Sequence, residues 1–172
     1  MHILGRKQAH FLLLIINQPI MPTKPFEQLW QYNNWANEVL FKAFEAYGDR
    51  MPVPCLRLLS HIFNAQSTWL SRVNGEKPMV GLWDMHDLEA CKKLHAETSE
   101  GIRTAIERHA DDLDIKIEYA NSRGQVFQNT LLDILFQVFN HATYHRGQIA
   151  MDMRINGLEP VNTDYINFVR LG

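Results

Sequence analysis

The chain has 172 residues, of which 46% are apolar and 21% charged, enough to bury a hydrophobic core within one domain. Its formal net charge is −2 and it has no long run of one sign, so we expect neither nucleic acid nor a membrane as a partner. The two cysteines, Cys55 and Cys91, do not form a C-x-x-C pair. This pattern disfavours a disulfide framework and a thiolate zinc site, and a cytoplasmic location is expected.

Residues 1–22 form a leader that we separate from a single domain over residues 23–172. Its apolar run, residues 11–16, is shorter than the roughly 7–15 residues of a secretory h-region, and no clear cleavage site follows. It is also far below the ~20 residues that span a bilayer. Met21 followed by Pro22 is a second plausible start. We interpret the leader as a surface-attached segment or an upstream extension, with an export signal as the alternative.

Apolar side chains that recur every three or four residues predict four helices of roughly 20–27 residues. These helices are expected at residues 23–48, 55–74, 87–110 and 130–156. Between the third and the fourth, Ile115, Ile117 and Tyr119 alternate with polar residues and precede the turn sequence of residues 121–124. The chain is therefore expected to form a short β-hairpin there.

This order of elements predicts an all-α fold, an antiparallel four-helix bundle with a short β-hairpin insertion before the fourth helix. The tail, residues 164–170, is expected to pack along the bundle. The first helix carries more aromatic side chains than one bundle face needs, and a homodimer is therefore expected. Those aromatic residues are Trp30, Tyr32, Trp35, Phe41 and Phe44.

His141 and His145 lie four residues apart in the fourth predicted helix, so their side chains stack on one face. Two imidazoles so placed can bind one metal ion. A third ligand must come from elsewhere, and His61, in the middle of the second helix, is the best candidate. An H-x-x-x-H pair on a helix often arises by chance, and a solvated polar stripe without a metal also explains the spacing. The same stripe supplies candidates for hydrogen bonds to the imidazoles: Asp133, Gln137, Gln148 and Asp152.

Several other chemistries lack their motifs. The chain contains no E-x-x-H, no H-E-x-x-H, no C-x-x-C-H and no glycine-rich phosphate loop. The di-iron bundle, zincin, c-type haem and phosphate-loop patterns are thereby excluded. The remaining histidines are interpreted as surface or hydrogen-bonded core residues: His2, His10, His86, His95 and His109.

Three segments resemble the DinB/YfiT-like superfamily of metal-dependent enzymes. They are residues 32–37 (YNNWAN), residues 61–66 with Trp69, and residues 140–148, which contain H-x-x-x-H-R-G-Q. Their order and separation agree with the family, as does the N-S-R-G-Q hairpin before the last helix. The resemblance extends from about Pro25 to Arg170. One departure is Gln66, where many relatives carry an acidic residue.

The resemblance implies a four-helix bundle, often dimeric, in which His61, His141 and His145 bind one divalent metal ion. Ni²⁺ or Zn²⁺ is favoured, with Fe or Mn as alternatives. It also favours a thiol S-transferase, in which a low-molecular-weight thiol attacks a small electrophilic substrate. A metal-dependent hydrolase and a non-catalytic, stress-related metal-binding module remain open. Tyr144 and Asp152 are the candidate catalytic residues.

Overall fold

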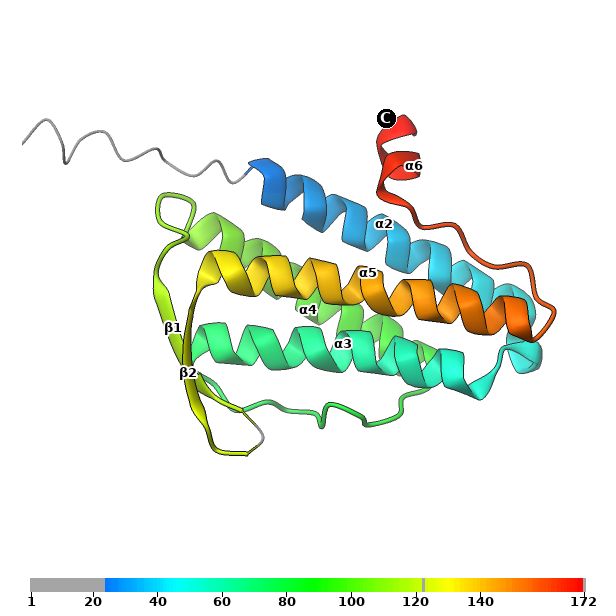
Figure 1. Cartoon of the computed structure of the whole chain (residues 1–172), viewed down its shortest axis with the longest axis horizontal. Coiled ribbons are helices and arrows are strands. Elements are labelled where there is room, and N and C mark those ends of the chain that lie inside the picture. The colour runs from blue at the N-terminus through cyan, green and yellow to red at the C-terminus, as the bar shows by residue number, and fades with distance from the viewer. Residues whose placement is uncertain (1–23, 122, 172) are drawn as a thin grey trace, which may run out of the picture.

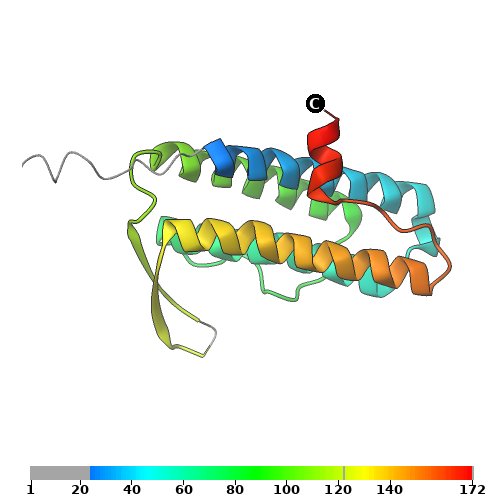
Figure 2. The same ribbon diagram turned by 45° about the horizontal axis from the view of Figure 1, so that its top comes forward.

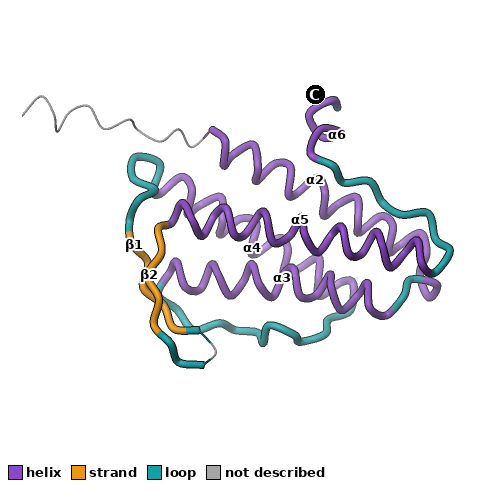
Figure 3. Tube along the Cα trace, viewed as in Figure 1, coloured by secondary structure: helices purple, strands orange, loops and turns teal. Residues whose placement is uncertain are grey.

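The computed structural model describes residues 24–121 and 123–171 (Figure 1). Its elements are, in chain order, α2 (Lys24–Tyr47), the 3-10 turn η1 (Gly48–Arg50), α3 (Val53–Asn74), α4 (Leu88–Arg108), β1 (Lys116–Ala120), β2 (Val126–Thr130), α5 (Leu131–Ile155) and α6 (Tyr165–Arg170). The mostly helical fold with a hairpin before the last long helix is confirmed (Figure 3). The expected leader, residues 1–22, lies outside the described residues. None of the described helices is long and apolar enough to cross a membrane.

The four long helices lie side by side, but not all neighbours are antiparallel (Figures 1 and 2). α3 contacts α4 and α5, and α2 contacts the same two helices. α2 and α5 run in one direction, and α3 and α4 in the other (Figure 1). Side-chain contacts agree, because Ser60 lies 3.6 Å from Cys91, and Leu70, further along α3, lies against Gly101, further along α4. The prediction of an antiparallel arrangement is therefore wrong for α3 with α4 and for α2 with α5.

The connection between α3 and α4 explains this direction. Residues 75–87 run back along the outside of α3, so that α4 starts beside the beginning of α3 (Figure 1). The 22 residues of α3 make it ~33 Å long. At ~3.3 Å per residue, the connection of residues 75–87 is long enough to span this distance when extended. A short turn would have forced the two helices to be antiparallel.

Local signals set the helix ends. α3 begins at Val53 and includes Pro54, because the first turn of a helix needs no backbone N–H from proline. It ends before Gly75, whose φ of 70° is a left-handed conformation that glycine adopts without strain. α5 begins with a capping box, in which Thr130 Oγ1 accepts from the Asp133 amide and the Asp133 carboxylate accepts from the Thr130 amide.

Two clusters of buried apolar side chains form the core, and polar residues lie between them. Along α2, Phe26 belongs to one cluster and Leu40 to the other, with Asn33 and Asn37 in between. The β-hairpin packs at one end of the helices, where the Tyr119 ring meets the ring of Trp69.

Arg146 of α5 is the centre of this polar layer and is only 1% exposed. Its guanidinium donates to Asn33 Oδ1 at 2.8 Å and to Thr143 Oγ1 at 2.9 Å, and lies over the Tyr32 ring. Among the described residues it makes no ion pair, and its Nε atom has no hydrogen-bond acceptor. The buried charge is therefore held by neutral oxygens and an aromatic face.

The tail packs against α2, as predicted, and forms the short helix α6 (Figure 2). The Tyr32 hydroxyl donates to the Thr163 carbonyl at 2.8 Å, and its ring meets that of Tyr165. Phe168 lies 5.9 Å from the Trp35 ring. Two of the aromatic side chains that suggested a homodimer are thus in contact with the chain's own tail. The homodimer itself stays a prediction.

Candidate metal centre

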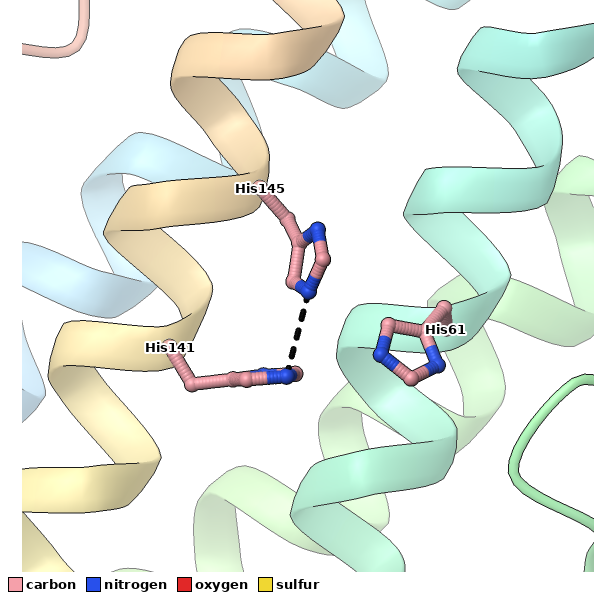
Figure 4. Close-up of side chains that lie close together, drawn as sticks. All are labelled: His61, His141 and His145. Carbon is pink, nitrogen blue, oxygen red and sulfur yellow. Dashed lines mark hydrogen bonds between the residues drawn. The ribbon is translucent and has the colours of Figure 1, made fainter.

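The three predicted histidines meet at the seam between α3 and α5 (Figure 4). His61 comes from α3, and His141 and His145 come from successive turns of α5. One ligand nitrogen from each lies within 4.8 Å of the others, and the Nε2 atoms of His141 and His145 are 3.1 Å apart. The three histidines singled out in the sequence are thus the ones that could share an ion, and their role as metal ligands stays a prediction. The sequence could not show that α3 and α5 are neighbours.

Hydrogen bonds orient two of the imidazoles. His61 Nδ1 lies 2.8 Å from the Leu82 carbonyl oxygen, and His145 Nδ1 lies 2.6 Å from Gln148 Oε1. Because both oxygens only accept, each Nδ1 carries the proton and each Nε2 has a lone pair, which in His145 faces the hydrogen-bonded Nε2 of His141 at 3.1 Å (Figure 4). This is the tautomer that a ligand needs, and a hydrogen bond at the second nitrogen is typical of metal-binding histidines.

The polar stripe of α5 is only partly used for this purpose. Gln148 makes the expected bond, whereas the Asp133 carboxylate is engaged in the N-cap of α5. Gln137 and Asp152 make no hydrogen bond to the three histidines within the described ranges. The Leu82 carbonyl was not predicted, because a backbone acceptor carries no side-chain signature in the sequence.

Burial keeps His141 and His145 neutral. Desolvation, followed by the proximity of His145 and His61, lowers the pKa of His141 to about 4. Desolvation also lowers the pKa of His145, although the bond to Gln148 acts in the opposite direction. Both imidazoles are therefore in their neutral form near neutral pH, in which one ring nitrogen carries a proton and the other has a lone pair for a cation.

The donor set fits a divalent ion. Two nitrogens at ~2.0–2.1 Å from a tetrahedral zinc ion are roughly 3.3 Å apart, close to the 3.1 Å between the two Nε2 atoms of α5. Imidazole nitrogen suits Zn²⁺, Ni²⁺ and Fe²⁺ alike, so the ligands do not select one metal. No carboxylate or thiol joins this group among the described residues. Three neutral ligands would leave the charge of the ion uncompensated and its remaining positions open.

An aromatic side chain from residues 75–87 covers one ligand. The Trp83 ring stacks on His61, with centroids 3.8 Å apart and an 8° angle between planes. Arg57 of α3 lies over the same indole at 5.1 Å. Asn64 fixes this segment to α3, because its Nδ2 donates to the Asp84 carbonyl and its Oδ1 bonds His86 Nε2. No pattern in the sequence indicates these contacts, although Asn64 stands one turn after His61.

The two candidate catalytic residues occupy different surroundings. Tyr144 is 64% exposed, and its ring meets the edge of His145 at 5.1 Å. Asp152 is half-buried and lines a pocket of about 460 Å³ between α3 and α5. Neither hydrogen-bonds to a ligand histidine in the described structure, and their catalytic roles stay predictions. Gln66 is buried, and both polar atoms of its amide lack a partner.

The largest of the described pockets lies away from the histidines. It has a volume of about 660 Å³ and is formed between α2, α5 and the region of α6, with Leu29, Phe136 and Tyr165 in its walls. The 460 Å³ pocket is smaller but shares two residues with the surroundings of the metal centre, Trp83 and Gln148. Proximity to the ligands, rather than volume, identifies it as the functional candidate.

Fold and site together define a helical protein whose candidate metal centre is built by three histidines from two helices. Residues 21–171 match the model of the DinB family, and the chain therefore belongs to that family. It is similar to Protein DinB of Bacillus subtilis (strain 168), with 24% identity over 155 residues that cover 80% of this chain and 90% of that protein.

Proposed function

We propose that the chain is a metal-dependent thiol S-transferase that joins a low-molecular-weight thiol to a small electrophile. The observation that carries this proposal is the convergence of His61, His141 and His145, two of which carry their proton on Nδ1 and so keep the lone pair on Nε2. A divalent ion, when bound there, lowers the pKa of a thiol or water at its open position. Ni²⁺ or Zn²⁺ is the ion proposed, with Fe or Mn as alternatives.

The protein's own groups position the reacting molecules. The Leu82 carbonyl and the Gln148 amide hold two imidazoles in one tautomer, and Trp83 covers a face of His61 and keeps water from it. In the transfer, the thiol gives its proton to solvent and its sulfur forms a bond to the electrophilic carbon. The leaving group departs from that carbon with the bonding electron pair.

A thiol is favoured over water as the nucleophile. The ordinary pKa of a thiol is ~8.5 and that of water is far higher, so a thiol needs a much smaller fall in pKa to ionise at neutral pH. A hydrolase also needs a general base for its water, and no carboxylate belongs to the ligand group in the described residues. The hydrolase is therefore the second candidate. A non-catalytic, stress-related metal-binding module is the third.

Metal analysis tests the first step. Elemental analysis of the purified full-length protein is expected to show about one divalent ion per chain, and His61→Ala and His141→Ala variants are expected to lose it. His109→Ala is the matched control, because His109 lies at the C-terminal end of α4, outside the group of three. A parent protein that takes up no stoichiometric metal would remove the basis of the proposal.

Activity assays then separate the three candidates. The metal-loaded protein is given thiol and electrophile pairs, and in parallel a panel of ester and amide substrates. We expect a thioether product that depends on His61 and His141. Hydrolysis without thiol transfer would favour the second candidate, and tight metal binding without turnover of either kind would favour the third.

The finer structural expectations belong to the same proposal. We propose that α2 to α5 form the family's four-helix bundle, that two copies of the chain associate as a homodimer, and that the protein acts in the cytoplasm. Sedimentation equilibrium at micromolar concentration measures the association directly. A single species with the mass of one chain, 20.0 kDa, would contradict the homodimer.

A further inference from the structure

The pocket between α3 and α5 borders the metal centre through residues that already contact its ligands. Trp83 stacks on His61, and Gln148 bonds His145, and both residues line this pocket. Its volume of about 460 Å³ lies within the range of small-molecule sites. A ligand that fills it would therefore lie against the two residues that contact His61 and His145.

Two opposite charges line the same pocket without neutralising each other. Arg57 extends from α3 and Asp152 from α5, and they are the only ionisable groups of ordinary acidic or basic type in its wall. No ion pair joins them to each other or to another described residue. Arg57 instead lies over the Trp83 ring, which leaves its N–H donors in the plane of the guanidinium free for an acceptor.

The rest of the wall is apolar. Pro54 and Leu58 come from α3 and Met151 from α5, and the indole of Trp83 adds an aromatic face. Such a pocket suits a ligand with a short aliphatic part and two charged groups of opposite sign. Arginine would bind the carboxylate and aspartate the ammonium group through charge-assisted hydrogen bonds, which are stronger than hydrogen bonds between neutral groups.

We infer that this pocket, the Arg57–Asp152 pocket, binds a thiol that carries both a carboxylate and an ammonium group. The carboxylate is held by Arg57 and the ammonium group by Asp152, and the sulfur points past Gln148 and Trp83 toward the histidines. This inference rests on the proposed thiol transfer, because it names the substrate class of that site. It assigns Asp152 to substrate binding, and not to proton transfer.

Three thiols test the carboxylate and the ammonium group of the ligand separately. L-cysteine has both groups, 3-mercaptopropionate lacks the ammonium group, and cysteamine lacks the carboxylate. Isothermal titration calorimetry of the full-length, metal-loaded protein measures the affinity of each. Arg57→Gln is expected to weaken L-cysteine and 3-mercaptopropionate about tenfold and to leave cysteamine unchanged. Asp152→Asn is expected to weaken L-cysteine and cysteamine about tenfold and to leave 3-mercaptopropionate unchanged.

The matched control is Arg50→Gln. Arg50 also lies over an aromatic ring, that of Tyr47 at 5.3 Å, but it is not part of the pocket wall. It is expected to change none of the three affinities. Thermal unfolding of each variant checks that the fold is retained. If Arg57→Gln and Asp152→Asn leave all three affinities unchanged, the assignment of the charges is wrong.

A fourth probe, S-methyl-L-cysteine, distinguishes failure of this inference from failure of the proposed function. It keeps both charged groups but has no thiol, so it is expected to bind with and without metal and to show the same loss in both variants. Suppose that S-methyl-L-cysteine binds without metal and loses affinity in both variants, while metal loading adds no affinity for L-cysteine. The assignment of the pocket is then supported, and the proposed binding of a thiol at the metal centre is wrong. If metal loading raises the affinity of all three thiols equally and the variants have no effect, thiol binding at the metal centre is supported and the assignment of the pocket is wrong.

Discussion

Acidification is expected to destabilise the fold through His95, which lies in the polar layer. His95 is 7% exposed, its ring contacts those of Phe41 and Phe63, and its Nδ1 accepts from the Asn37 amide. Burial first, and then the charge of Arg146, lower its pKa from 6.5 to about 4. The folded state therefore favours neutral His95, and the stability it contributes is fully present above pH 6.5 and is lost as the pH falls toward 4.

The magnitude follows from the two pKa values. Each pKa unit corresponds to ~1.4 kcal/mol, so the complete loss is about 3 kcal/mol below pH 4. Between pH 7.5 and pH 5, the loss from this residue is about 2 kcal/mol. Urea unfolding at both pH values measures the free energy of unfolding of the parent and of His95→Phe, which keeps an aromatic ring but cannot be protonated.

The comparison between the two proteins isolates His95. The variant loses the hydrogen bond from Asn37 at every pH, and the ligand histidines titrate in both proteins, so these effects cancel in the difference between pH 7.5 and pH 5. The parent is expected to lose about 2 kcal/mol more than the variant over this interval. Equal losses in the two proteins would refute the reasoning that burial and Arg146 hold His95 neutral.

Three further predictions concern the metal centre, the polar layer and the last long helix. Gln148→Leu removes the acceptor that fixes the His145 tautomer and is expected to weaken metal binding about 10–100-fold in a competitive chelator titration, whereas Gln137→Leu is expected to have no effect. Arg146→Lys keeps the charge, but one ammonium group cannot replace the planar fork that reaches Asn33 and Thr143. It is expected to lower the free energy of unfolding by about 2–3 kcal/mol in urea, and an unchanged midpoint would contradict this account. Thr130→Ala removes the N-cap of α5 and is expected to cost about 1 kcal/mol, while Thr130→Ser is expected to recover most of it.

The local part of the metal centre could be predicted from the sequence, and the part that depends on tertiary packing could not. The spacing of His141 and His145 places them on one helix face in any α-helix, so their proximity is a local property. His61 became part of the site only through the motif resemblance, because periodicity does not show that α3 packs on α5. The carbonyl of Leu82 and the stacked ring of Trp83 had no local signal at all.

Asp133 shows how one local interaction excluded another. Its position in the polar stripe of α5 made it a candidate partner for a ligand histidine. Its carboxylate instead accepts from the Thr130 amide at 3.2 Å, as part of the capping box. The sequence T-x-x-D before an apolar run is itself a recognised N-terminal signal, and it decides the role of this residue. The stripe on α5 thus combines a helix cap, metal ligands and a pocket wall.

The long connection of residues 75–87 accounts both for the error in helix direction and for the shape of the site. Because it returns along α3, it brings the Leu82 carbonyl to His61 and the Trp83 ring over it, and Asn64 holds it there through Asp84. An antiparallel bundle with a short turn would have left His61 without this acceptor and without a cover. The same segment supplies Trp83 to the wall of the pocket that Arg57 and Asp152 line. The direction of α4, which the helical periodicity does not encode, therefore determines which groups surround the candidate metal centre.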